Sequence, residues 1–95
     1  MHIISRKRLK DAIARHNELE IPLNAWFRVA KRASWKSLAE VRQTYPSADA
    51  VDRWTVFNIK GNQYRLIVVI NYVFSRIYVR HVLTHSEYDR GRWKQ

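Results

Sequence analysis

Apolar residues recur three and four positions apart in the first half of the chain, which is the spacing of one face of a helix. Residues His2 to Ile4 form a short extended start. Ser5 can then cap a first helix, and a second helix carries Pro22 in its first turn, where proline is tolerated. The apolar positions of these helices are Leu9, Ala12 and Ile13, and then Leu23, Trp26, Phe27 and Ala30. Two amphipathic helices are therefore predicted.

A third, shorter helix is indicated by a capping box. In Ser37-Leu38-Ala39-Glu40 the hydroxyl and the carboxylate can each satisfy a free amide of the first turn. This helix should run to about Thr44, because Pro46 disfavours its continuation. Residues 47–53 are predicted to form a surface loop.

The period changes in the second half, where β-branched and aromatic residues dominate. Residues 54–59 and 63–72 are predicted to form a hairpin around the turn Lys60-Gly61-Asn62, and residues 76–83 a third strand. The run from Leu66 to Ile70 is apolar without alternation, so its strand should be central and covered by helices on at least one face. A second capping box, Thr84 to Glu87, predicts a final helical turn through Asp89.

This order of elements predicts one small α+β domain over residues 1–95, with two to three N-terminal helices packed on one face of a twisted, mainly antiparallel sheet. The chain has 95 residues, of which 46% are hydrophobic, so it can form a core. Without cysteine it can form neither a disulfide, a thiol nucleophile nor a cysteine-based zinc site.

The charge is strongly positive. Lys and Arg number 18 against 8 Asp and Glu, a net charge of +10, and both halves contribute to the excess. Such a domain is expected to meet phosphates, in nucleic acid or at an anionic membrane surface. The longest apolar run, 66–74, is about half the ~20 residues of a membrane-spanning helix. At the N-terminus the basic residues follow the apolar ones, which is the reverse of their order in a secretory signal. We therefore expect a cytoplasmic protein with no membrane partner.

Two arginines are candidates for phosphate binding. Strict alternation places Arg65 on the face of the long strand opposite Leu66, and Arg80 beside Tyr78 on the last strand. If these two guanidiniums share an exposed face, they suit a phosphate and its developing charge. They are otherwise two surface arginines on a solvated sheet. Lys60 at the hairpin turn would add a third cation.

His81, His85 and Tyr88 lie close together in sequence and can move protons without a metal. Alternation groups His81 with Ile77 and Val79, which favours a core role for it, whereas His85 lies in a turn. His81 and His85 are four residues apart, but the first is on a predicted strand and the second in a turn rather than both on one helix. Since there is also no cysteine, neither a metal site nor any other cofactor is predicted. A glycine-rich phosphate loop and a Gly-x-Ser-x-Gly elbow are also absent.

Two blocks of the sequence carry a resemblance to a known family. They are Val56-Phe57-Asn58-Ile59-Lys60-Gly61-Asn62-Gln63-Tyr64-Arg65-Leu66-Ile67 and Ile77-Tyr78-Val79-Arg80-His81-Val82-Leu83-Thr84-His85-Ser86-Glu87-Tyr88-Asp89. Both blocks resemble the HigB-type toxins of bacterial type II toxin–antitoxin systems. The opening residues 1–5 and residues 35–38 are similar to that family as well. The resemblance implies a RelE-like fold and a metal-independent mRNA interferase, in which a ribose 2′-hydroxyl attacks the adjacent phosphate while the messenger is translated.

The resemblance also implies roles for individual residues and a set of partners. Arg65 and Arg80 would stabilise the pentacoordinate phosphate, His85 would transfer a proton, and Tyr88 would stack on a base or assist. The RNA-binding residues would be Lys60, His81, Arg90 and Arg92. The implied partners are a HigA-type helix-turn-helix antitoxin, messenger RNA and the A site of the small ribosomal subunit.

Two alternatives stay open. The fold also occurs in toxins with other targets, such as DNA gyrase. A non-catalytic basic module that binds RNA or ribosomes would use the same charge, with four tryptophans and five tyrosines available for stacking.

Overall fold

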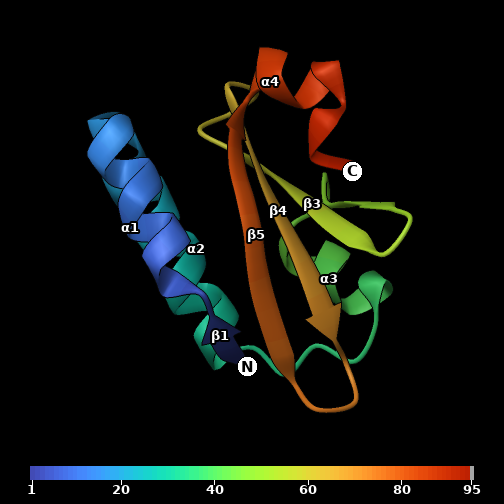
Figure 1. The fold of residues 1–95 in the computed structure, drawn as a ribbon. Coiled ribbons are helices and arrows are strands. Elements are labelled where there is room, and N and C mark those ends of the chain that lie inside the picture. The colour runs from blue at the N-terminus through green and yellow to red at the C-terminus, as the bar shows by residue number, and fades with distance from the viewer. Residues whose placement is uncertain (95) are drawn as a thin grey trace.

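The computed structural model of this chain describes residues 1–94, which form a five-stranded sheet with four α-helices (Figure 1). The elements in chain order are β1 (His2–Ile4), α1 (Arg6–Arg15), η1 (Asn17–Leu19), α2 (Glu20–Arg32), α3 (Leu38–Thr44), β2 (Asp49–Val51), β3 (Trp54–Ile59), β4 (Tyr64–Asn71), β5 (Arg76–Thr84), α4 (His85–Arg90) and η2 (Arg92–Lys94). The strand order is β1-β5-β4-β3-β2, so β4 is central, as the sequence predicts.

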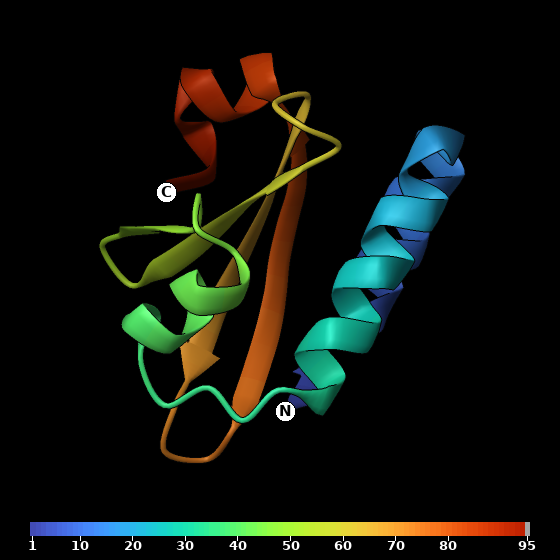
Figure 2. The ribbon, with the colours of Figure 1, turned by 180° about the vertical axis from the view of Figure 1, so that it is seen from behind.

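The three N-terminal helices cover one face of the sheet. Viewed from behind, α3 lies in front of the strands, and α2 lies beside them with α1 behind it (Figure 2). Buried apolar side chains of the helices, such as Leu23, Trp26 and Val41, meet Phe57 and Leu66 of the sheet in one core. The predicted α+β architecture is therefore confirmed, and it resembles the expected RelE-like arrangement.

Most predicted elements are present, with three differences. The expected loop 47–53 contains the short strand β2, which pairs with β3 and widens the sheet. β1 pairs with β5 in parallel, an arrangement that no local pattern encodes. Ser5 does precede α1, but its backbone is left-handed at φ 71° and its side chain makes no capping hydrogen bond. By contrast, Ser37 and Thr84 both cap their helices.

A β-bulge at Arg80 changes which residues of β5 share a face. Val68 pairs with Val79, whereas Ile67 pairs with His81, so Arg80 is the extra residue between them. The prediction of strict alternation along β5 is therefore wrong beyond Val79. His81 joins the face of Ile67, away from the helices, and the core role favoured by its grouping with Val79 does not hold.

The face of the sheet opposite the helices is partly covered by the C-terminal segment. Trp93 of η2 packs edge to face against Trp54 of β3, with ring centroids 5.2 Å apart, in a second cluster with Val56 and Ile67. The rest of this face is open. Within residues 1–94, no helix is both long enough and apolar enough to cross a membrane.

Candidate active site

Arg65 is a buried guanidinium on β4, and it ties the β3–β4 turn to α4. Its Nη1 donates to the carbonyl oxygens of Asn62 at 3.1 Å and Tyr64 at 3.2 Å. Its Nη2 donates to Oδ1 of Asn62 at 2.7 Å and bonds to Nδ1 of His85 at 3.0 Å. These four bonds engage all four hydrogens of the two terminal nitrogens.

The expectation that Arg65 lies on an exposed face is wrong, because only 8% of the residue is accessible. The hairpin turn and α4 enclose it, and its guanidinium carbon lies 5.4 Å from the centre of the Tyr88 ring. Arg65 is therefore held in place before any substrate arrives. A phosphate would contact its terminal nitrogens only by replacing one of the present partners.

His85, the first residue of α4, lies between a cation and a carboxylate. Arg65 has no acceptor, so Nδ1 of His85 must accept the bond from Nη2, and the hydrogen of the neutral ring is on Nε2. That nitrogen lies 3.0 Å from Oδ2 of Asp89, one helical turn later. The side chain of His85 remains 48% exposed. The geometry thus gives an Arg65–His85–Asp89 chain whose histidine is open to a ligand.

Tyr88 forms the aromatic wall of this site. Its ring stacks on Trp93 at 5.2 Å between centroids and 15° between planes, while the indole Nε1 of Trp93 donates to the Tyr88 carbonyl at 3.0 Å. Tyr88 is half-buried, so part of the residue is accessible to solvent.

The position of α4 is fixed at both ends. Both bonds of the predicted capping box are present: Thr84 Oγ1 accepts from the Glu87 amide at 3.2 Å, and Glu87 Oε1 accepts from the Thr84 amide at 2.9 Å. The bond from the Thr84 amide to the carboxylate is also the main reason for the lowered pKa of Glu87. The amide of His85 donates to the Gln63 carbonyl at 2.9 Å, which attaches the helix to the hairpin turn. Gly91 ends the helix in the left-handed conformation, at φ 73°.

The other predicted site residues lie around this centre without contacting it. Lys60, at the tip of the hairpin, is exposed. Hydrogen bonds to the backbone and to Tyr64 lower the pKa of Glu18 in η1, and the charge of Lys60 adds to that effect. Arg90 ends α4 and Arg92 begins η2, and both are exposed. Arg80 is exposed too, with its guanidinium carbon 5.5 Å from the centre of the Tyr78 ring. No hydrogen bond or ring contact found in residues 1–94 joins Arg80 to Arg65 or His85.

His81 lies between Arg80 and α4. Its partial burial, and then the neighbouring Arg8 and Arg80, lower its pKa. It lines two adjoining cavities. One, of about 240 Å³, lies between α1 and β5, and the other, of about 360 Å³, lies against α4 and η2. His81 thus connects the α1 side of the molecule with the α4 side.

Three contributors escaped the sequence-based reasoning. Asp89 is four residues after His85 on a helix, a spacing that could have indicated their contact. Asn62 was interpreted only as a turn residue, although it binds Arg65 through two atoms. Arg8 donates to the carbonyl of Arg80 at 2.8 Å across 72 residues of sequence, and no local signal predicts that contact.

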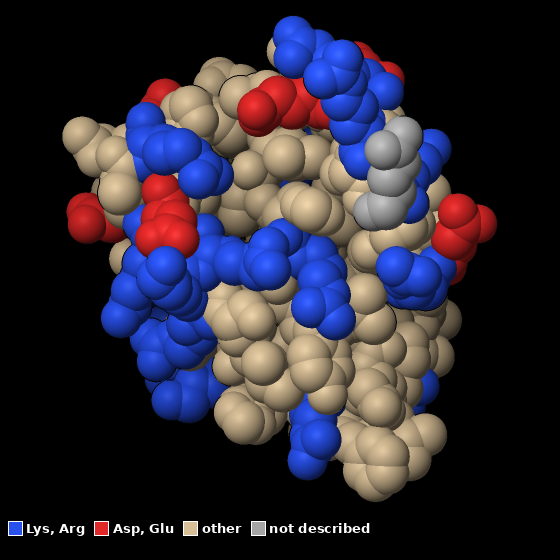
Figure 3. All heavy atoms as spheres, in the orientation of Figure 1, with Lys and Arg blue, Asp and Glu red and all other residues tan. Residues whose placement is uncertain are grey.

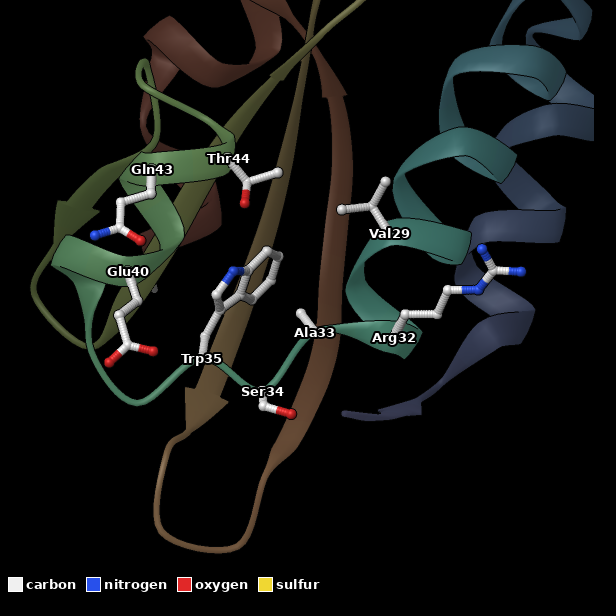
Figure 4. A pocket seen from close by; sticks show the side chains of 8 residues that line it. All are labelled: Val29, Arg32, Ala33, Ser34, Trp35, Glu40, Gln43 and Thr44. Atoms are coloured by element: carbon white, nitrogen blue, oxygen red, sulfur yellow. The ribbon is translucent and has the colours of Figure 1, made fainter.

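A further cavity, of about 350 Å³, lies between α2 and α3 on the helical face (Figure 4). Its walls include Val29, Trp35 and Glu40, and it contains none of the predicted site residues. Within residues 1–94, no three His, Asp or Glu side chains come together as a candidate metal site.

The comparisons with known proteins agree with this architecture. Residues 19–91 match the family model described as HigB_toxin, the RelE-like toxic component of a toxin–antitoxin system. The chain belongs to this HigB toxin family. It is 31% identical to the mRNA interferase HigB of Escherichia coli O6:H1 over 93 residues, which are 95% of this chain and 90% of the relative.

Two further relatives give the same result. The mRNA interferase toxin HigB of Escherichia coli K12 and the mRNA interferase HigB of Shigella flexneri are each 32% identical over 92 residues, or 94% of this chain and 88% of each relative. The predicted resemblance to HigB toxins is confirmed.

Proposed function

We propose that this toxin is a ribosome-dependent mRNA interferase that cuts RNA through its own 2′-hydroxyl group, without a metal ion. The observation that carries the proposal is the Arg65–His85–Asp89 chain, with Tyr88 beside it, in a protein whose relatives are named mRNA interferases. We further propose that it acts in the cytoplasm and that a HigA-type antitoxin inhibits it.

In the proposed reaction the 2′ oxygen attacks the adjacent phosphorus and the bond from phosphorus to the 5′ oxygen breaks. The products are a 2′,3′-cyclic phosphate and a 5′-hydroxyl. A phosphate that draws Nη2 of Arg65 toward itself leaves the lone pair of His85 Nδ1 free to accept the proton of the 2′-hydroxyl. Asp89 then stabilises the imidazolium through Nε2, as the carboxylate does in a catalytic triad. The proton held by His85 is available to the departing 5′ oxygen.

The cations have a separate part in this scheme. Negative charge develops on the non-bridging oxygens of the phosphate in the transition state, and fixed positive groups stabilise it with little reorganisation. Arg65 is such a group, because burial and its bonds to Asn62 and the Tyr64 carbonyl keep it at the site when Nη2 turns from His85 to the phosphate. Arg80 and Lys60 are exposed and able to approach the RNA backbone.

The non-catalytic alternative is less well supported by the arrangement of the aromatic residues. All four tryptophans are buried, so none offers an open face on which bases can stack. Tyr88 is the half-buried aromatic residue at the site.

The test is to map the ends of a defined messenger in a reconstituted translation reaction, with ribosomes present or omitted. The wild type should give discrete cuts only with ribosomes, and the products should end in cyclic phosphates. His85→Ala should lose at least 100-fold in cleavage rate, in line with the usual contribution of a general base. Ser86→Ala, the exposed neighbour on α4, is the matched control and should cut normally.

Two results would contradict the proposal. One is translation arrest by the wild type with an intact messenger. The other is full cleavage of a messenger that carries a 2′-O-methyl group on the nucleotide before the cut, since the attacking group would then be missing.

A further inference from the structure

The groove between α1 and β5 has a composition unlike that of the other cavities. Arg8, Asp11 and Arg15 lie three and four residues apart on one side of α1 and form one wall, and Arg80 and His81 lie on the other. Its volume is about 240 Å³. Seen from the open face of the sheet, Lys and Arg side chains gather over α1 and extend across the middle of the molecule (Figure 3).

The two walls are fixed relative to each other. Nη1 of Arg8 donates to the carbonyl oxygen of Arg80 at 2.8 Å. β1 pairs only with residues 76–78 of β5, so the edge of β5 at the bulge has no neighbouring strand and faces α1 instead. The bulge therefore brings the guanidiniums of two elements to one groove.

The cations of this groove form no salt bridge among the described residues, although Arg15 lies near enough to Glu87 to help lower the pKa of that carboxyl. None of the salt bridges found in residues 1–94 involves Arg8, Arg15 or Arg80. The acidic group in the groove, Asp11, is paired with Lys7 at 3.7 Å. Burial, and after it the positive charges of Arg8 and Arg80, lower the pKa of His81. Planar guanidiniums with several free donors match the oxygens of a phosphodiester.

The groove continues toward the proposed reaction centre. The neighbouring cavity shares His81 and Leu83 with it and extends to Arg90 and Trp93. Leu83 is the residue of β5 that pairs with Arg65. A strand rises about 3.3 Å per residue, so Arg80 and Thr84, the residue before His85, are about 13 Å apart along β5. A single phosphate cannot fill that length, whereas a run of nucleotides can.

We propose that this groove is a second phosphodiester-binding site, in which Arg8 and Arg15 of α1, with Arg80, hold the RNA backbone beside the nucleotide that reacts. The inference rests on the proposed function, because it identifies the ligand as RNA. It adds two residues of α1 to the RNA-binding surface, and both lie outside the segments that resemble the HigB family.

The test is the affinity of a short, fully 2′-O-methylated RNA for the full chain, measured by fluorescence anisotropy at several chloride concentrations. Such an RNA cannot be cleaved. Arg15→Gln should weaken binding about fivefold to tenfold and reduce the slope of log affinity against log salt by about 1, the change expected when one phosphate contact is lost. Arg8→Gln should behave in the same way. Arg28→Gln, the same charge change at an exposed position of α2 outside the groove, is the control and should weaken binding less than twofold.

Equal affinities for the Arg15→Gln and Arg28→Gln proteins would overturn the proposal. Because Arg8 also joins α1 to β5, the Arg15 variant decides the matter even if the Arg8 variant loses stability. Failure of the groove can be told from failure of the proposed function. If the wild type cuts RNA but the groove variants bind it as tightly as the wild type does, the groove is not an RNA-binding site and the proposed function stands. If both groove variants lose affinity but the wild type does not cut RNA, the groove is supported and the proposed nuclease activity is rejected.

Discussion

Two neighbours determine which nitrogen of His85 carries its hydrogen. Arg65 can only donate, so it directs the lone pair of Nδ1 inward, and Asp89 accepts from Nε2. In its neutral form a histidine in this position has one tautomer that both neighbours favour, and Asp89 is placed to stabilise the charged form. That arrangement suits a base more than an acid, since a protonated Nδ1 would face the guanidinium.

Asp89→Asn tests this assignment. The amide can present its NH₂ group to Nε2, which favours the wrong tautomer, and it cannot stabilise the imidazolium. The cleavage rate should fall about tenfold or more while the melting temperature changes little, because Asp89 is largely exposed. Asp52→Asn is the control, since Asp52 lies in a turn at φ 52°, a conformation that Asn adopts readily. Equal rates for the two variants would remove Asp89 from the mechanism.

His81 predicts a pH dependence of stability. Its pKa is lowered in the folded protein, chiefly by burial and then by Arg8 and Arg80, so below the usual value of 6.5 the unfolded chain binds the proton more readily. Stability should therefore fall as the pH decreases through 6.5 toward the folded-state pKa. Thermal melts at pH 7.5 and pH 5.5 in low salt would measure the loss, and His81→Gln should reduce it. A variant whose loss matches that of the wild type would show that other groups dominate.

The helix α4 supplies His85 and Tyr88, so its attachment should affect activity more than overall stability. Thr84→Ala removes one bond of the capping box and should cost about 1 kcal/mol. Ser37→Ala removes the equivalent bond at α3, on the opposite side of the molecule from the site, at a similar cost. We expect a much larger loss of cleavage in the Thr84 variant. Denaturant melts check that the two stability losses match, and equal activities would show that α4 need not be held at its N-terminus.

The sequence predicted helices and strands well where they depend on contacts between residues close in sequence. The capping box at Thr84, Pro22 in a first turn and the apolar run of β4 each reflect contacts within a few residues, and each prediction is confirmed. At Ser37 the predicted side-chain cap is present, but the Glu40 carboxylate accepts from the Lys36 amide instead of the Ser37 amide. The bulge at Arg80 could not be predicted, since it depends on how β4 and β5 align. One extra residue moved His81 to the open face and invalidated the alternation beyond it.

The same difference between local and long-range contacts applies to the candidate site. The sequence indicated Arg65, His85 and Tyr88, which the fold does bring together, because all three lie at one end of the β4–β5 hairpin and the helix that follows it. It also suggested that Arg80 would join Arg65. Arg80 instead lies beside α1, which is remote in sequence. Whether a side chain is buried, as Arg65 is, depends on which segment folds over it, and the sequence did not show that α4 would do so.

The whole molecule keeps its core apart from its proposed RNA-binding surfaces. The larger core lies between the helices and the sheet, the His85 site lies at one end of the β4–β5 hairpin, and the basic groove lies between α1 and the edge of β5. Positive charge on one domain favours binding to RNA, but it also repels itself in the folded state. With a net charge of +10, this chain should show both effects strongly.

Salt should therefore change stability and RNA affinity in opposite directions. Raising sodium chloride from about 10 to about 100 mM shortens the screening length from about 30 to about 10 Å. This should raise the melting temperature by about 2–5 °C while RNA affinity falls at least tenfold.

Sulfate at equal ionic strength should raise the melting temperature further, because an anion that binds only the folded state stabilises it. That additional rise should shrink in Arg15→Gln and persist in Arg28→Gln. If chloride and sulfate raise the melting temperature of the wild type equally, screening alone explains the stabilisation and the groove does not bind sulfate. If RNA affinity does not change with salt, the positive charge does not act through phosphate contacts.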